Sequence, residues 1–398
     1  MTVTKVNNSK DLKYSNRLQV LRMIVSGGPV TRSEITAQTG LTKMTVSNIT
    51  ADLAEAGFIE EVKDEYAWDR VGRQPMFLRL SGKSPCILGI CIGRKYCAVQ
   101  ICDLSAKIIS EERYDYPKDI TGGMLLDIVI ALALKLKKRT KRKIICAGIT
   151  AMGPVDSVSG TILSPTGFYG IENLEVTKPL SEKLNMPCFL FHDASAAALA
   201  EYMFGGGQDL NDFMYVLILN GIGAGIIING ALIEGPTGLG GELGHTIINS
   251  SGPQCSCGNR GCLEVYVNPN SLMDLIEQNI GPRPDIDPVD ALPYIIDKAG
   301  NGDEGAVKVL DILSDYLAVA IGNILNMISL ENIFLGYKGE DNGILEEMLR
   351  NKLLSRIVAG SSRSLSIHHS AFHSKGPVVG ATAYAVSQIF DGKIQLDF

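Results

Sequence analysis

Three cysteines and one histidine within eighteen residues constrain this chain more than any other feature of its sequence. The side chains are His245, Cys255, Cys257 and Cys262, and Gly258 and Gly261 let the backbone turn between the thiols. One imidazole and three thiolates are the four ligands that a closed tetrahedral zinc site requires. We therefore predict one structural zinc ion per chain, and the alternative is that these are incidental buried thiols. The other cysteines lie in apolar segments, where core packing explains them.

From about residue 85 onward, short apolar runs alternate with helical patterns. The runs typical of β-strands are Ile87–Ile92, Cys97–Asp103, Ile144–Ile149, Cys188–Phe191 and Met214–Leu219, and helices are expected near 122–137 and 193–203. Such alternation predicts an α/β domain. Because 398 residues exceed one ordinary core, we predict two domains, at residues 1–82 and 83–398.

The composition favours a cytoplasmic protein without membrane insertion. The first residues are polar, and no apolar run approaches the ~18 residues of a membrane span. Nine cysteines, an odd number, are typical of reduced thiols rather than of a disulfide framework.

The first fifty residues have the pattern of a helix-turn-helix. A helix over residues 11–27 ends at two glycines, and Thr31 with Glu34 three residues later predicts a capping box that opens a second helix, which ends at Gly40. A third helix is expected from Lys43 to about Ala56. Its apolar face is Val46, Ile49 and Leu53, whereas Lys43, Thr45, Ser47, Asn48 and Thr50 are expected to face outward. Short polar side chains let such a helix enter the DNA major groove, and an ordinary small helical domain is the alternative.

Two β-prone stretches, Phe58–Val62 and Met76–Leu80, flank a polar loop that contains Arg70 and Arg73. This pattern predicts a wing, in which Arg73 beside Gly72 can reach a narrow minor groove. Residues 1–50 hold seven basic and two acidic residues, a net charge of +5, so the remaining 348 residues carry −11 of the total of −6. A basic head on an acidic body favours a DNA-binding module joined to a ligand-binding domain. The candidate DNA contacts are Arg32, Lys43, Thr45, Ser47, Asn48, Arg70 and Arg73.

Four segments carry a family resemblance: Gly153-Pro154-Val155, residues 192–201, Gly241-Glu242-Leu243-Gly244-His245 and the cluster at 255–264. They resemble the ROK family of repressors, open reading frames and kinases, over essentially the whole chain. The resemblance implies an amino-terminal winged helix-turn-helix and a two-lobed ribonuclease-H/actin-like, sugar kinase-like domain.

In family kinases, an aspartate at the position of Asp193 deprotonates the sugar hydroxyl that attacks ATP. The resemblance implies a sugar site made of Thr166, His192, Asp193, Glu242, His245 and Glu264. His192 and Thr166 stand where the family usually has asparagines, which changes hydroxyl recognition. Glu201 is expected on a solvated helix face.

The ATP side departs further from the family. Its Asp-x-Gly-Gly-Thr loop is here Cys91-Ile92-Gly93-Arg94-Lys95, its Gly-Thr-Gly is Leu219-Asn220-Gly221, and its late Gly-Gly is Gly336-Tyr337. Phosphoryl transfer depends on positioning and charge stabilisation, so these changes predict the loss of kinase activity.

The resulting hypothesis is a sugar-responsive repressor of carbohydrate-metabolism genes, which binds a pseudo-palindromic operator as a homodimer or a dimer of dimers. One alternative is a ROK sugar kinase with an accessory amino-terminal domain. Another is a regulator whose effector is a sugar-transport protein that docks near the zinc region.

Overall fold

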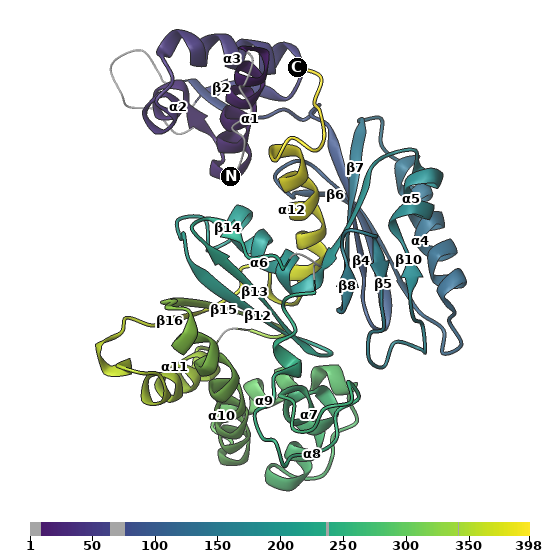
Figure 1. Cartoon of the computed structure of the whole chain (residues 1–398), viewed down its shortest axis with the longest axis vertical. Helices are drawn as coiled ribbons and strands as arrows, with labels where there is room; N and C mark the ends of the chain where they lie inside the picture. Colours follow the sequence, from purple (N-terminus) through teal and green to yellow (C-terminus); the bar gives the residue numbers. More distant parts are fainter. Residues whose placement is uncertain (1–8, 64–75, 236–238, 341) are drawn as a thin grey trace, which may run out of the picture.

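The computed structural model describes residues 9–63, 76–235, 239–340 and 342–398. A small amino-terminal module stands at one end of a larger two-lobed body (Figure 1). Both lobes are built on a five-stranded sheet, and two helices lie between the sheets. Among the described residues, no helix combines the length and the apolar character needed to cross a membrane.

The amino-terminal module has the predicted three helices and hairpin. Its elements are α1 (Ser9–Gly27), β1 (Val30–Thr31), α2 (Arg32–Thr39), α3 (Lys43–Glu55), β2 (Ile59–Lys63) and β3 (Met76–Leu80), with sheet order β1-β3-β2. The capping box is confirmed, because Glu34 N–H donates to Thr31 Oγ1 (3.2 Å) and Thr31 N–H donates to the Glu34 carboxylate (2.7 Å). Strands β2 and β3 pair up to Lys63 and Met76. The wing residues Arg70 and Arg73 lie outside the described residues.

One prediction for α3 is wrong. Val46, Ile49 and Leu53 are buried as expected, but so is Thr50, which was expected to face outward. Its Oγ1 accepts a hydrogen bond of 2.9 Å from Nε of Arg32, whose guanidinium also pairs with Glu61 on β2. The hydroxyl thus joins α3 to Arg32 at the start of α2, and Arg32 in turn pairs with the hairpin.

The first lobe has a sheet of order β11-β7-β4-β5-β6. Its strands are β4 (Cys86–Ile92), β5 (Tyr96–Cys102), β6 (Ile108–Asp115), β7 (Ile144–Ala151) and β11 (Cys188–His192). Helices α4 (Gly122–Lys137) and α5 (Thr177–Leu184) cover one face (Figure 1). A small sheet of β8 (Val155–Asp156), β9 (Thr161–Ile162) and β10 (Leu174–Glu175) follows β7.

The second lobe repeats this topology, with order β14-β13-β12-β15-β16. Its strands are β12 (Phe213–Ile218), β13 (Ile222–Ile228), β14 (Ala231–Leu232), β15 (Asn332–Tyr337) and β16 (Ser366–His369), and its helices are α7 (Glu264–Val267), α8 (Pro269–Asn279), α9 (Ala291–Gly300), α10 (Glu304–Met327) and α11 (Ile344–Arg356). In each lobe the first three strands form an antiparallel meander and the last two add parallel to the first. The duplicated sheets confirm the expected ribonuclease-H/actin-like fold.

Helices α6 (Asp193–Phe204) and α12 (Gly376–Phe390) lie between the two sheets. Helix α12 packs on β4 and β7, and α6 packs on β12 and β13. The contact is so close that a Cβ on Gly148 would lie 1.8 Å from the carbonyl oxygen of Ala381. Only glycine fits there, because the helix backbone rests directly on the strand.

The expectation of a solvated Glu201 on α6 is also wrong. This carboxylate is fully buried, and it accepts hydrogen bonds from Ser370 Oγ (2.7 Å), Gly206 N–H (2.7 Å) and Ala371 N–H (3.3 Å). It therefore joins α6 to the segment that follows β16.

Candidate functional site

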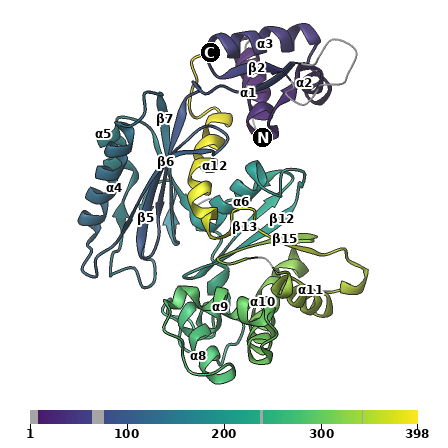
Figure 2. The ribbon, with the colours of Figure 1, turned by 180° about the vertical axis from the view of Figure 1, so that it is seen from behind.

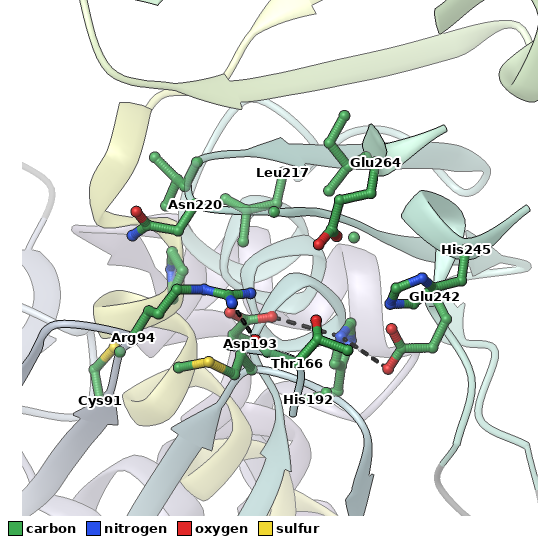
Figure 3. Close-up of a pocket in the computed structure, with 18 of the residues that line it drawn as sticks. Cys91, Arg94, Thr166, His192, Asp193, Leu217, Asn220, Glu242, His245 and Glu264 are labelled. Carbon is green, nitrogen blue, oxygen red and sulfur yellow. Dashed lines mark hydrogen bonds and ion pairs between the residues drawn. The ribbon is translucent and has the colours of Figure 1, made fainter. Parts of the chain in front are cut away.

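A pocket opens between the lobes, where β11 ends and α6 begins (Figure 3). Its empty space, including the open solvent at its mouth, is about 700 Å³. The structure brings all six predicted sugar-site residues to its wall: Thr166, His192, Asp193, Glu242, His245 and Glu264. They come from separate segments of both lobes, so the fold assembles the site.

Two carboxylates and an imidazole form the floor of the pocket. His192 Nε2 lies 3.5 Å from Asp193 Oδ1 and 3.9 Å from Glu242 Oε1 (Figure 3). Its Nδ1 lies 3.2 Å from Ser195 Oγ. Asp193 Oδ1 also accepts the backbone N–H of Ala194 at 2.7 Å. Burial raises the pKa of Asp193, although His192, this N–H and Arg94 counteract it.

Glu242 has hydrogen-bonding capacity to spare. Its Oε1 is buried, and no hydrogen-bond donor among the described residues reaches it. Burial raises the pKa of this carboxyl, with His192 and His245 acting in the opposite direction. A buried acceptor without a partner costs free energy unless a ligand donor satisfies it. A hydroxyl group is suited to that role.

The four predicted metal ligands converge on one point. Their donor atoms all lie within 4.8 Å of one another, with Cys255 Sγ 3.7 Å from His245 Nδ1 and Cys257 Sγ 3.6 Å from Cys262 Sγ. A tetrahedron with zinc–sulfur bonds of about 2.3 Å has edges of about 3.8 Å, so the spacing fits zinc.

The backbone of this cluster depends on a glycine. Gly261 has a φ of 67°, and a Cβ there would lie 1.6 Å from the carbonyl oxygen of Asn249.

The pKa values of two thiols in the cluster shift in opposite directions. Burial opposes ionisation of Cys257, but hydrogen bonds from the Asn259 backbone and from the thiols of Cys255 and Cys262 lower its pKa to about 7. Burial and the thiols of Cys257 and Cys255 raise the pKa of Cys262 to about 12. A bound cation would remove the cost of holding several thiolates together.

The cluster and the pocket share structure. His245 belongs to both, and Leu263 N–H donates to the Thr246 carbonyl at 2.9 Å. Glu264 begins α7 directly afterward, and its Oε2 lies so near Gly244 that a Cβ there would be 3.0 Å away. The metal ligands and two of the sugar-site carboxylates, Glu242 and Glu264, therefore lie on one segment, residues 242–264.

The described DNA-contact candidates divide into two groups. Lys43, Ser47 and Asn48 are exposed on α3 and Thr45 is half-buried, so all four lie on the surface of the predicted recognition helix. Arg32 is half-buried and occupied by Thr50 and Glu61, so its first role is inside the module. Arg70 and Arg73 fall outside the described residues.

Comparison with known proteins identifies the family. A sequence model of the ROK family matches residues 87–388. The chain belongs to the ROK family. Residues 10–66 match the MarR family, which agrees with the helix-turn-helix of the amino-terminal module.

Relatives that match both the amino-terminal module and the two lobes include transcriptional regulators. The xylose repressor of Bacillus spizizenii is 27% identical over 384 residues, covering 96% of this chain and 97% of that protein. The DNA-binding transcriptional dual regulator NagC of Escherichia coli is 30% identical over 338 residues, covering 83% of this chain and 82% of that protein. The crystal structure of a ROK family transcriptional regulator, a homolog of the E. coli MLC protein, has a TM-score of 0.76 and 25% identity over 96% of this chain and 97% of its own. A ROK family glucokinase from Streptomyces griseus, solved with glucose and AMPPNP, shares the fold at a TM-score of 0.64 and 23% identity, with 75% of this chain and 98% of that chain covered.

On the side where the ROK kinases have their phosphate loop, this ROK protein has large side chains. Arg94 donates a hydrogen bond to the Thr166 carbonyl, and its guanidinium reaches into the pocket (Figure 3). Lys95 Nζ lies 3.0 Å from both carboxylate oxygens of Asp287 in the opposite lobe. Tyr337, at the late Gly-Gly position, is fully buried and stacks on His369 with ring centroids 4.2 Å apart.

The sequence interpretation treated Arg94 only as a missing glycine. The structure makes it a pocket residue, beside Asp193 and Thr166. The sequence feature that could have predicted this role is a long, charged side chain at a position where the family has a glycine. Its partners are 72 and 99 positions away, which sequence spacing does not reveal.

Proposed function

We propose that this ROK protein is a sugar-responsive transcriptional repressor of the xylose and N-acetylglucosamine repressor type, which does not phosphorylate its ligand. One observation carries the proposal: a helix-turn-helix and a pocket lined by carboxylates occur in one chain, and Arg94 lines that pocket where the family kinases have a glycine of their phosphate loop. Its likeness to repressors over 96% of the chain supports the same role.

The ligand proposed for the pocket is a sugar or sugar derivative. Asp193, Glu242 and Glu264 supply acceptors for hydroxyl groups, and His192, His245 and Thr166 complete the ring of polar contacts. Rigid acceptors that each take one or two hydroxyl donors are suited to a polyol. Oε1 of Glu242, which no hydrogen-bond donor among the described residues reaches, is an acceptor that such a ligand would satisfy.

The proposed DNA site is the exposed face of α3 with the wing. The side chains that would enter the major groove are Lys43, Thr45, Ser47 and Asn48. The contact would be supported or extended by Arg32, Arg70 and Arg73. The DNA-binding domain would be residues 1–82, and the ligand domain residues 83–398. A homodimer or dimer of dimers would match a pseudo-palindromic operator with half-sites one helical turn or a multiple apart. Such a protein acts where the chromosome lies, in the cytoplasm.

Zinc is the proposed resident metal, one ion per chain. His245, Cys255, Cys257 and Cys262 would hold it and leave no open position, so its role would be to fix the segment that carries Glu242 and Glu264.

The test has a DNA arm and a sugar arm. Wild-type chain is used to enrich duplexes from a random pool, and affinity for the enriched duplex is measured with and without members of a sugar panel that includes xylose and N-acetylglucosamine. We expect a pseudo-palindromic sequence and a sugar that both raises Tm and shifts DNA affinity. Failure to enrich any sequence would refute the repressor function.

A ROK sugar kinase is the second candidate, because Asp193 stands in the pocket where the family kinases have their general base. A coupled ATP-consumption assay over the same panel separates the two functions. We expect no sugar-dependent turnover, whereas turnover that disappears in Asp193→Asn would establish the kinase.

A further inference from the structure

The segment after α12 packs against the amino-terminal module. We call residues 391–398 the tail. Figure 2 shows the chain running from α12 to the side of α1 and α3. Tyr14 on α1 binds the tail twice: its hydroxyl donates to the Ile394 carbonyl (3.3 Å) and accepts the Leu396 N–H (2.9 Å).

Phe398 is the centre of this contact. Its ring centroid lies 5.5 Å from that of Tyr14 and 5.2 Å from that of Phe58, and the Arg17 guanidinium lies 5.8 Å from it. Aromatic pairs at these separations attract beyond the burial of their surface, as does a cation near a ring face. Three side chains of the module, two from α1 and one from the residue before β2, therefore meet one tail side chain.

Arg17 extends the contact to the recognition helix. Its guanidinium forms a hydrogen-bonded ion pair with Asp52 on α3. The hydrogen bond from Arg17 lowers the pKa of Asp52, so this carboxylate stays charged at neutral pH. The tail thus reaches α3 through a single intermediate side chain.

At its other end, α12 begins at the ligand pocket. Pro377 lines the pocket, and its carbonyl accepts a hydrogen bond of 2.9 Å from Thr150 Oγ1, while the Val378 carbonyl accepts one of 2.7 Å from Gln100 Nε2. Fifteen residues of helix extend about 22 Å from there, at about 1.5 Å per residue. Its last residue, Phe390, lies under the Arg22 guanidinium of α1 at 5.0 Å.

We propose that the tail is a positioning segment for DNA recognition: Phe398, Tyr14 and Arg17 hold α3 in an orientation set by α12, whose first turn borders the pocket. The inference rests on the proposed DNA-binding and sugar-binding functions. It identifies residues outside the helix-turn-helix that determine DNA affinity and its response to ligand.

Full-length Phe398→Ala and Phe398→Tyr are compared with wild type and with Asp397→Ala. Asp397 is the matched control, because it belongs to the tail but pairs with Lys143 of the first lobe (3.0 Å) and with none of the described residues of the module. The readouts are amide hydrogen exchange in α3, affinity for the duplex that wild type enriches, and the change in that affinity with xylose or N-acetylglucosamine. Tyr14→Phe, which removes only the bridging hydroxyl, is the milder variant if Phe398→Ala does not fold.

We expect Phe398→Ala to raise exchange in α3 and weaken DNA binding by about tenfold, within the usual 5- to 150-fold range of such couplings. The sugar effect on DNA affinity should disappear, while Phe398→Tyr and Asp397→Ala stay near wild type. Unchanged exchange in α3 of Phe398→Ala and Tyr14→Phe would overturn the positioning role. A wild-type chain that enriches no duplex would refute the proposed function instead, and the exchange data would still decide about the tail.

Discussion

Lys95 and Asp287 form an ion pair that joins the two lobes: the ammonium lies 3.0 Å from both carboxylate oxygens. Both side chains are about half exposed, at 52% and 47%, so solvent screening reduces what the pair contributes. We expect a coupling free energy below about 1 kcal/mol at pH 7.

The ion pair should depend on pH. Hydrogen bonds from the backbone N–H of Val289 and from the side-chain ammonium of Lys95 lower the pKa of Asp287. The contribution should therefore be present at neutral pH and lost as pH falls through the acid range. A double-mutant cycle of Lys95→Met and Asp287→Asn, by urea unfolding at neutral and acid pH, measures it. A coupling that grows on acidification would contradict the assignment.

Sugar affinity should fall on mild acidification. Because burial raises the pKa of Glu242 and Asp193, these acceptors become protonated at higher pH than the ~4 typical of exposed carboxyls. Glu242→Gln keeps an acceptor oxygen but does not titrate. The affinity of this variant for sugar should therefore be lower than that of wild type at neutral pH and should depend less on pH. Thermal shifts with the best sugar of the panel, measured from mildly acid to neutral pH, provide the comparison. The exposed Glu182→Gln is the control, and parallel pH profiles for wild type and Glu242→Gln would assign the titration to other groups.

Loss of one metal ligand should affect both zinc content and the pocket. Cys257→Ser is expected to lower zinc content, destabilise the ligand domain and weaken the sugar response together, because His245 belongs to both sites. Cys188→Ser, in the other lobe, is the control. Elemental analysis and thermal unfolding measure the effects. Less than about half a zinc ion per wild-type chain after metal-replete purification would be inconsistent with the tight site expected here.

The wing prediction concerns Arg73. Replacing it with Ala should weaken DNA binding and reduce the slope of log affinity against log salt by about one, because one cationic contact is lost. Arg79→Ala is the matched control in the same module, since Arg79 pairs with Glu60 at 2.8 Å. Equal affinities and salt slopes for Arg73→Ala and wild type would remove the wing from the DNA site.

Removal of the buried carboxylate of Glu201 should destabilise the fold. Glu201→Ala leaves the Ser370 hydroxyl and the N–H groups of Gly206 and Ala371 without their acceptor, at an expected cost of about 3 kcal/mol. The exposed Glu182→Ala should change the unfolding free energy by less than about 0.5 kcal/mol. Urea unfolding of both variants tests the difference, and similar midpoints would show that the buried network contributes little.

Local patterns in the sequence predicted much of this structure. The Thr31–Glu34 capping box, the strand runs and the ligand spacing from 255 to 262 depend on near neighbours, and the structure contains all three. The resemblance to ROK proteins added the remaining pocket residues, which no local pattern connects.

Long-range partners account for what the sequence did not predict. Thr50 was expected to face outward because it is polar, although it stands four residues after Val46 and therefore on the same face of α3. Its partner Arg32 lies 18 positions earlier, which the local pattern does not reveal. Glu201 looked like a solvated charge because its acceptor role depends on Ser370, 169 positions later. The place of α12 between the two sheets follows from close backbone packing at Gly148, which is likewise invisible in sequence spacing.

The packing of the amino-terminal module has a consequence for protein engineering. Leu21 and Leu53 of the module belong to the same apolar cluster as Ala383 and Ile389 of α12 and Leu396 of the tail. A chimera cut between residues 82 and 83 would therefore divide a shared core and expose apolar surface on both pieces. DNA specificity should be exchangeable between such regulators when the amino-terminal module and the last sixteen residues are both taken from the same parent protein. Biosensors assembled from these proteins need both ends of the chain from one parent.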